Sequence, residues 1–370
     1  MQLNKLLSPL VTDTITLNNR VVMAPMSRRR AENGVPNSSY ELYFAQRASA
    51  GLIITDNTAV AANGIGYLKT PGIYNNEQKE GWKKVVDAVH SRGGKIIVQL
   101  VHAGRIGHSL NYDGGEPIVA PSAIQANGVV RIPGDLHVPL PVPEALTTVG
   151  AKAMIEAHIQ AAINAIEVGF DGVEIHGAHG FLPEQFLHPH TNRRTDEYGG
   201  SIENRSRFLL EIMKGVVAAI GKERTGVRLS PFAHINDLPA YEEEVETYKY
   251  LIDELQKLGI LYIHLSALVA NGTSSIATEF IRDVRSRFSN LLMLAGGFTA
   301  ASAENALQHN LVDLVAFGKP YIANPDLVER FRNNTELAIP DPETFYQGGD
   351  EGYIDYPAIH TNERSRCAAL

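Results

Sequence analysis

His176 and His179, two histidines separated by two residues, are the clearest candidates for chemistry in this chain. Imidazole is a common metal ligand, and His188 and His190 follow nearby. However, no His-x-His sequence stands near residue 23, and Asp313 is the one carboxylate in the last apolar run. Two imidazoles on one loop can instead donate hydrogen bonds to a carbonyl, nitro or phenolate oxygen. We favour this second use and keep a metal-dependent hydrolase as the alternative.

Gln99 and Arg228 are polar side chains inside otherwise apolar runs. The glutamine amide offers an acceptor and two donors, whereas arginine offers only donors and a permanent charge, so each needs a polar partner. An isoalloxazine ring satisfies both, because its N3–H and O2 match the amide. A fixed cation beside its N1–C2=O edge stabilises the charge of the reduced ring. The alternative is an internal ion pair or a structural hydrogen bond.

Two glycine sequences near the C-terminus, Gly296-Gly297 and Gly318-Lys319, could bind an anion. Paired glycines let backbone N–H groups approach a phosphate, a helix beginning near Thr299 adds its positive end, and Lys319 adds a full charge. Either sequence alone would more simply form a tight turn. Together, on adjacent strands, they favour a phosphate site.

The elements that position these residues are predicted by a repeated sequence pattern, in which short apolar runs alternate with helical patterns. Continuous apolar runs indicate strands buried on both faces, as in a parallel sheet covered by helices. Eight such units favour a (β/α)₈ TIM barrel in the α/β class over an open doubly wound sheet, because no glycine-rich dinucleotide fingerprint follows Met23. The predicted strands are 20–23, 52–55, 95–101, 172–176, 226–230, 260–266, 291–295 and 312–317.

We expect residues 1–357 to form one barrel domain with a capping excursion at 103–144, after the third strand. This connection is rich in Gly and Pro, is far longer than usual βα loops, and 129–142 favours a hairpin. Residues 358–370 lack periodicity and are expected to form a mobile tail. The tail ends in Cys367-Ala-Ala-Leu370, the form of a prenylation box, but four letters are a weak signal and we expect no lipid.

The composition favours a cytoplasmic enzyme with a small-molecule partner. The net charge of −8 opposes broad binding to nucleic acid or to an anionic membrane surface. A single cysteine fits a reducing compartment, and the N-terminus lacks the pattern of a signal peptide. We expect a monomer or a small homo-oligomer.

Six ordered sequence segments resemble the old yellow enzymes, and the likeness extends from about Leu7 to Pro357. The stretch Pro25-Met-Ser-Arg28 is similar to the classical branch, whose pattern is Pro-Met-Thr-Arg, rather than to the branch with Cys after Pro-Met. The matching segments are 21–28, 46–55, 99–105, 176–181, 191–205 and 352–357.

The resemblance implies a flavoprotein with non-covalent FMN that takes hydride from NADPH or NADH and reduces an activated alkene, such as an α,β-unsaturated carbonyl or a nitroalkene. It implies that Gln99 and Arg228 hold the pyrimidine edge of the flavin, and that His176 and His179 hold the substrate oxygen. Around the flavin ring it implies Pro25, Met26, Ser27 and Asn57, and around the phosphate Gly296, Gly297, Gly318 and Lys319. Pocket-wall positions match Tyr67, Phe181 and Tyr346.

Three residues depart from the family pattern. Phe181 stands where many members carry the tyrosine that protonates the substrate. Either Tyr67, Tyr346 or a water supplies that proton, or the enzyme acts on substrates such as nitro compounds, whose charge rests on oxygen and whose protonation can wait for solvent. Lys319 replaces an arginine. The phosphate would therefore meet a single ammonium charge instead of a guanidinium that can donate two parallel hydrogen bonds. Asn57 replaces a small residue that lets the backbone approach the flavin. On this fold, the alternative function is a metal-dependent TIM-barrel hydrolase that uses His176 and His179.

Overall fold

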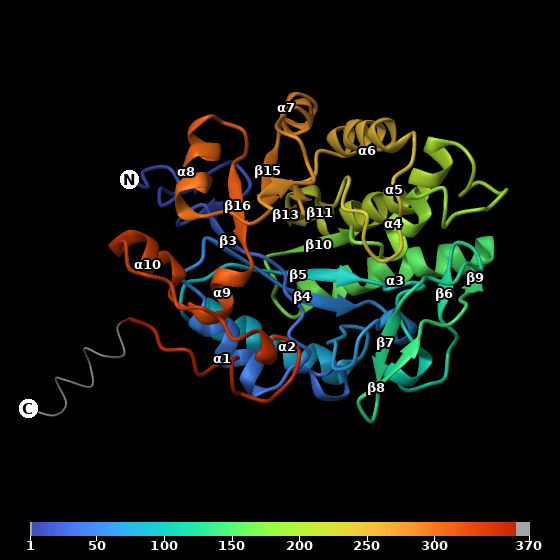
Figure 1. The fold of residues 1–370 in the computed structure, drawn as a ribbon, viewed down its shortest axis with the longest axis horizontal. Coiled ribbons are helices and arrows are strands. Elements are labelled where there is room, and N and C mark those ends of the chain that lie inside the picture. The colour runs from blue at the N-terminus through green and yellow to red at the C-terminus, as the bar shows by residue number, and fades with distance from the viewer. Residues whose placement is uncertain (1, 360–370) are drawn as a thin grey trace, which may run out of the picture.

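The computed structural model describes residues 2–359 and contains a closed barrel of eight parallel strands that neighbour one another in chain order (Figure 1). This confirms the predicted (β/α)₈ barrel. The predicted strand bounds agree within two residues, except that β4 continues to Ala59. The strands are β3 (Val21–Met23), β4 (Leu52–Ala59), β5 (Ile96–Val101), β10 (Gly172–Gly177), β11 (Thr225–Leu229), β12 (Tyr262–Ser266), β15 (Leu291–Ala295) and β16 (Leu314–Phe317).

Alternate residues of each strand pack into two different apolar layers. In β5, Ile96 and Val98 face the layer between the barrel and its helices, whereas Ile97 packs inside the barrel. In β15, Leu292 belongs to the outer layer and Met293 to the inner one. Both faces of every strand are therefore covered, which explains why the sequence shows continuous apolar runs rather than alternation.

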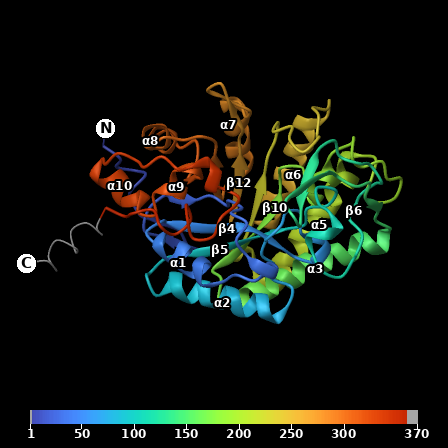
Figure 2. The ribbon, with the colours of Figure 1, turned by 60° about the horizontal axis from the view of Figure 1, so that its bottom comes forward.

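The barrel is surrounded by helices that follow its strands in the chain. Figure 2 shows α1, α2 and α3 along one side, below β4 and β5. The start of α2 is defined by a capping box, in which Asn75 and Gln78 satisfy each other's backbone N–H groups. The helices are α1 (Ser38–Gln46), α2 (Asn76–His90), α3 (Thr148–Glu167), α4 (Leu182–Leu187), α5 (Ile202–Ile220), α6 (Glu244–Leu258), α7 (Thr278–Arg287), α8 (Ala300–Gln308), α9 (Lys319–Ala323) and α10 (Leu327–Asn333).

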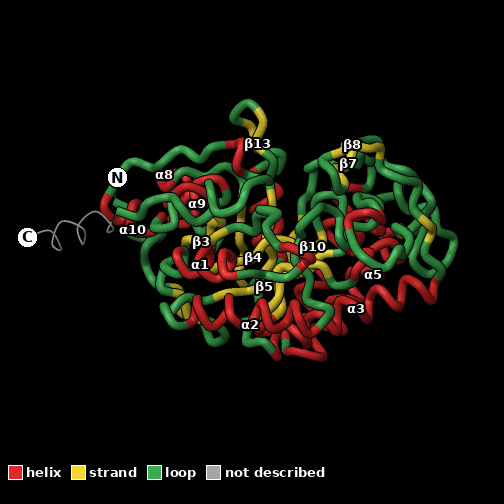
Figure 3. Tube along the Cα trace, turned by 90° about the horizontal axis from the view of Figure 1, so that it is seen from below, coloured by secondary structure: helices red, strands yellow, loops and turns green. Residues whose placement is uncertain are grey.

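Within residues 2–359, short strands outside the barrel form four two-stranded sheets. The hairpin expected within 129–142 is present as β7 and β8, and it stands out on the same side of the molecule as β13 (Figure 3). The short strands are β1 (Leu10–Val11), β2 (Thr16–Leu17), β6 (Val119–Ala120), β7 (Val129–Ile132), β8 (Leu136–Pro139), β9 (Glu144–Ala145), β13 (Val269–Ala270) and β14 (Thr273–Ser274).

Residue 1 and residues 360–370 lie outside the described residues. The expectations for the Cys367-Ala-Ala-Leu370 sequence and for most of the 358–370 tail fall there. Within residues 2–359, no helix combines the length and apolarity needed to cross a membrane.

The segment 344–352 is tied to the barrel by two arginines that follow β3. The Arg28 side chain is buried and donates to the backbone carbonyls of Phe345 at 3.0 Å and Gly352 at 2.7 Å. Arg30 donates to the carbonyls of Thr344 and Gln347, each at 2.7 Å. These bonds fix the segment that carries Tyr346 against the carboxyl end of the barrel.

We expect Arg28→Met to lower the free energy of unfolding by about 2–4 kcal/mol, because buried carbonyl groups lose a charged donor while the aliphatic volume is kept. Chemical unfolding followed by circular dichroism measures the change. Arg193→Met, at an exposed position, is the control and should be nearly neutral. Equal stability of the two variants would show that the Arg28 bonds do not hold segment 344–352.

Candidate active site

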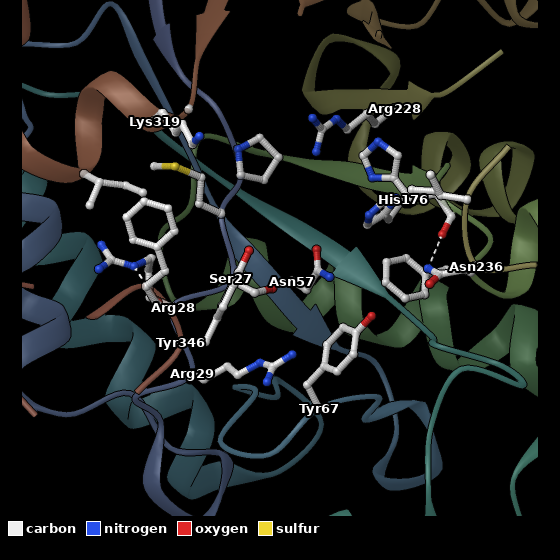
Figure 4. A pocket seen from close by; sticks show the side chains of 18 residues that line it. Ser27, Arg28, Arg29, Asn57, Tyr67, His176, Arg228, Asn236, Lys319 and Tyr346 are labelled. Atoms are coloured by element: carbon white, nitrogen blue, oxygen red, sulfur yellow. Dashed lines mark hydrogen bonds between the residues drawn. The ribbon is translucent and has the colours of Figure 1, made fainter. Parts of the chain in front are cut away.

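A cavity of about 480 Å³ lies at the carboxyl end of the barrel strands (Figure 4). This volume is within the range of small-molecule sites, and the position is where barrel enzymes carry their active sites. It brings together most of the residues expected from the sequence, which come from loops and strands far apart in the chain. Those that line it are Pro25, Met26, Ser27, Asn57, Tyr67, His176, His179, Phe181, Arg228, Gly318, Lys319 and Tyr346.

Arg228 places a charge at the base of this cavity. Its side chain is buried, and its Nη2 donates to Ser266 Oγ at 3.0 Å. Burial lowers the pKa of the guanidinium, and the neighbouring Glu174 carboxylate opposes this shift. Its Nε has no hydrogen-bond partner among residues 2–359.

Gln99 does not line the cavity, and its amide already has a protein partner. Its Nε2 donates to Glu174 Oε1 at 2.7 Å, and the other oxygen of Glu174 bonds His264 Nδ1 at 2.9 Å. The sequence interpretation missed Glu174 and His264, although both are polar residues within apolar runs. The structural hydrogen bond left open for Gln99 is therefore present. Its Oε1 still has no partner within the described chain.

Arg228 in the cavity lining and Gln99, two strands away in the barrel, fit the edge of a flavin. The unpaired Arg228 Nε is a donor and the unpaired Gln99 Oε1 is an acceptor, and both are buried. Leaving such atoms unpaired is costly, so they indicate a missing partner. A planar ring with both N–H and C=O groups on its edge supplies the two complementary functions. A register shift in β4 between Ile54 and Asn57 sets Asn57 beside Gln99 at this edge.

The two histidines lie together at the end of β10, with ring centroids 5.3 Å apart. His179 is fixed by its backbone, because its N–H donates to Ser230 Oγ at 2.8 Å and its carbonyl accepts from Asn236 Nδ2 at 2.7 Å. Its Nε2 lies 2.9 Å from Ser266 Oγ. Burial and the nearby Arg228 charge lower the pKa of both imidazoles well below the usual value, so both are neutral at pH 7.

Glu184 fixes the loop that carries His179 by hydrogen bonds to Gly180 and Ser230. Its Oε2 accepts from the Gly180 backbone N–H at 2.5 Å, and its Oε1 accepts from Ser230 at 2.9 Å and from Tyr248 at 2.6 Å. Burial raises the pKa of this carboxyl to about 7, and these hydrogen bonds oppose the rise. Sequence reasoning missed Glu184 because its partners are up to 64 residues away.

Three aromatic residues form one wall. The Phe181 ring lies 4.9 Å from His176 and 6.4 Å from Tyr67. Burial raises the pKa of Tyr67, while Arg29 and a hydrogen bond with Asn236 oppose the shift. Tyr346 is 54% exposed and sits at the rim.

The glycine residues expected around the phosphate divide between two cavities. Gly318 and Lys319 line the active-site cavity. Gly296 and Gly297 line a separate cavity of about 730 Å³ beside α7 and α8. Gly297 has a φ of +66°, a conformation that other residues adopt at a cost.

No group of three or more His, Cys, Asp or Glu side chains suited to a metal ion exists within residues 2–359. In the described chain, His188 bonds the Pro239 carbonyl at 2.7 Å instead of joining His176 and His179. The geometry therefore gives no support to the hydrolase alternative.

The TIM barrel thus combines a buried cation, buried polar atoms of Arg228 and Gln99 that lack partners within residues 2–359, and a neutral histidine pair. This combination is typical of a barrel enzyme that binds a planar redox cofactor. The chain matches the model of the NADH:flavin oxidoreductase / NADH oxidase family over residues 5–338. The chain belongs to this family, and the resemblance to the old yellow enzymes is confirmed.

Known relatives cover nearly the whole chain. It is 41% identical to 12-oxophytodienoate reductase 7 of Oryza sativa subsp. japonica, over 96% of this chain and 94% of the relative. It is 39% identical to a probable flavin mononucleotide-dependent alkene reductase of Leishmania infantum, over 95% and 97%. The solved structure of morphinone reductase matches with a TM-score of 0.92 and 44% identity, over 96% and 97%. The chain is thus an NAD(P)H-dependent flavin oxidoreductase with FMN as cofactor and small molecules as substrates.

We expect the histidine pair to make the fold sensitive to acid. Both folded-state pKa values lie below the unfolded value of about 6.5, so the unfolded chain binds more protons below that pH. Stability therefore falls as the pH drops below 6.5, by at most about 1.4 kcal/mol per pH unit for each histidine. The free energy of unfolding, measured with urea between pH 5.5 and 7.5, should change less steeply with pH in the His176→Gln/His179→Gln double variant than in the wild type. The exposed His137→Gln variant is the control, and an unchanged slope in the double variant would contradict neutral imidazoles.

Proposed function

We propose that this enzyme reduces the activated C=C bond of α,β-unsaturated carbonyls or nitroalkenes at the expense of NADPH or NADH. The observation that carries the proposal is the pair of neutral, buried imidazoles at the wall of the cavity. When bound, FMN supplies the redox centre that accepts hydride from the nicotinamide and delivers it to the alkene. The name of the Leishmania infantum relative, an alkene reductase, supports the same reaction.

We assign the cofactor contacts in three groups. Arg228 and Gln99 bind the pyrimidine edge, where the buried charge of Arg228 stabilises negative charge on the reduced ring. Lys319 and the glycines Gly296, Gly297 and Gly318 bind the phosphate. The ring itself is lined by Pro25, Met26, Ser27 and Asn57.

His176 and His179 are the catalytic residues that bind the substrate oxygen. A neutral imidazole N–H is a hydrogen-bond donor whose effect grows as negative charge develops on that oxygen. Two such donors withdraw electron density from the alkene and make its β-carbon electrophilic. Phe181 and Tyr346 complete the substrate-binding wall.

Tyr67 is the candidate proton donor for the substrate α-carbon. Phe181 has no hydroxyl, whereas Tyr67 packs beside it and lines the same cavity. A tyrosine phenol is protonated at neutral pH, and burial raises the pKa of Tyr67 further.

We further propose that the 103–144 excursion acts as a cap. Val130, Ile132 and Leu140 of this excursion pack in one apolar cluster with Phe181, and Tyr67 packs against that cluster. A movement of the β7–β8 hairpin would therefore shift Phe181 and Tyr67 in the wall of the cavity. We place the enzyme in the cytoplasm as one barrel domain, a monomer or a small homo-oligomer, on its composition.

Absorption spectroscopy tests the function. The purified protein should show flavin bands, release FMN on denaturation, lose its colour with NADPH under argon and regain it when an enone is added. Release of FAD, or a flavin that NADPH reduces but no activated alkene reoxidises, would contradict the proposal.

We expect His176→Ala/His179→Ala to slow alkene reduction far more than flavin reduction. Two polarising hydrogen bonds are lost, which costs about 2–4 kcal/mol in the alkene transition state. Stopped-flow absorbance separates the two half-reactions. Equal slowing of both half-reactions would show that the histidines do not act by polarising the alkene.

Tyr67→Phe should slow the reduction of simple enones more than that of nitroalkenes, because a nitronate carries its charge on oxygen and can wait for solvent to protonate carbon. Phe181→Tyr should accelerate enone reduction and leave flavin reduction nearly unchanged. General acid catalysis contributes about 10²–10⁴-fold, and a water can recover part of it. Rates of flavin reoxidation measure both effects. If neither substitution changes the enone rate, protonation does not limit the reaction.

A further inference from the structure

The three consecutive arginines after β3 have different environments. Arg28 and Arg30 use their donors on the carbonyls of segment 344–352. The Arg29 side chain forms no hydrogen bond or ion pair with any residue between 2 and 359, and its Nε is buried without a partner. Arg29 is thus the unpaired cation of the three.

Arg29 lies between two tyrosines at the active-site cavity (Figure 4). Its guanidinium carbon is 4.4 Å from the centroid of the Tyr67 ring and 5.0 Å from that of Tyr346. Ring faces attract a guanidinium but cannot accept its in-plane N–H bonds. The tyrosines therefore hold the cation in place and leave its donors free.

The backbone at Arg29 is in a strained conformation. Its φ is +54°, in the left-handed region that residues with a Cβ avoid. The bonds of Arg28 and Arg30 on either side hold this geometry. Such strain is tolerated where surrounding structure fixes it, and it concentrates at ligand sites.

A second cavity of about 130 Å³ adjoins the first and shares Arg29 and Tyr346 with it. Its described lining contains Arg29, Lys69 and Arg131, and no acidic residue. Lys69 is paired with Glu32, and Arg131 with Asp135. Arg29 is therefore the cation of this group whose charge no carboxylate offsets within residues 2–359.

Arg29 is charged at neutral pH, although it is partly buried and lies near another cation. Burial and the neighbouring Arg131 lower its pKa, and the two tyrosines oppose this, but a guanidinium stays protonated at neutral pH. The complementary ligand for its planar set of donors is a carboxylate or a phosphate.

We propose that Arg29 binds an anionic group, carboxylate or phosphate, of the molecule that occupies the active-site cavity. This inference rests on the proposed function and names its substrate class: alkenes whose oxygen end lies on His176 and His179, and whose other end carries a carboxylate. Arg29 and His176 lie on opposite sides of the cavity (Figure 4). The same donors suit a phosphate of the nicotinamide dinucleotide, so the experiment separates the two sources.

Matched ligands test the inference. Enones of the form CH₃CO–CH=CH–(CH₂)ₙ–COO⁻, with n from two to six, are compared with their methyl esters, which keep the alkene and lose the charge. The wild-type holoenzyme should favour the acid over the ester in kcat/KM at one or more chain lengths. Arg29→Gln should lower the acid-to-ester ratio about 10- to 100-fold. Arg29→Lys keeps the charge and should recover part of the ratio.

Lys69→Gln is the matched control, because it removes a nearby cation that already has a partner; its ratio should change less than about twofold. Neither Arg29 variant adds a new backbone restriction, since glutamine and lysine also carry a Cβ. Calorimetric titration with the saturated keto acid and its methyl ester gives a readout without turnover, and Arg29→Gln should weaken binding of the acid selectively.

The phosphate source is tested by the dissociation constants of NADPH and NADH in the flavin-reduction step. If Arg29→Gln raises these about tenfold and leaves the acid-to-ester ratio unchanged, the anion is the nucleotide phosphate and the carboxylate substrate class is wrong. If no ratio, titration or dissociation constant changes, Arg29 binds no anion and the inference is overturned. A wild-type enzyme that binds the keto acid through Arg29 but reduces neither enone would instead overturn the proposed function.

Discussion

The structure depends on one buried charge, that of Arg228, at the point where an apolar barrel opens into a cavity. A guanidinium without a counter-charge is very costly in such a place, so the barrel supplies Glu174 on the neighbouring strand. Burial would raise the pKa of that carboxyl, but His264, Arg228 and Gln99 lower it, so Glu174 is ionised. These four groups come from β5, β10, β11 and β12, which neighbour one another in the barrel.

Strand register sets these charged groups beside the candidate active-site residues. His176 is the register partner of Arg228, and Glu174 is that of Gln99. A shift of one residue in β10 would move His176 and Glu174 to the opposite face of the strand and leave Arg228 without its carboxylate. The loop after β10 is then held by Glu184 and Ser230, which fix the backbone of Gly180 and His179. Glu174, which stabilises the Arg228 charge, and the loop that we propose binds substrate thus belong to the same strand, β10.

The barrel and most cavity residues could be predicted from the sequence, because apolar runs are local and the ends of parallel strands meet at one edge. Partners could not be predicted. For Gln99 the sequence left open a cofactor contact or a structural hydrogen bond, and it could not identify the partner, Glu174, which lies 75 residues away and whose position depends on register. Gly296 and Gly297, which we propose bind the phosphate together with Gly318, border a separate cavity, and the sequence could not show this because adjacency of strands does not fix where their loops turn. The three residues from 28 to 30 are identical in type, and only their backbone conformations and partners distinguish them.

Arg228 and Arg29, each with a buried Nε that lacks a partner within residues 2–359, differ in how their charge is compensated. The charge of Arg228 is stabilised by the ionised Glu174 on the neighbouring strand, and its buried Nε has no partner within residues 2–359, which suits the edge of the flavin that we propose there. Arg29 has only aromatic faces beside it and keeps its full charge for an occupant. A carboxylate beside Arg29 would have stabilised the empty enzyme and competed with an anionic ligand for the same donors. Tyrosines allow the cation to be held without being neutralised, so in the proposed function the cavity has a permanent cofactor at Arg228 and an exchangeable anionic ligand at Arg29.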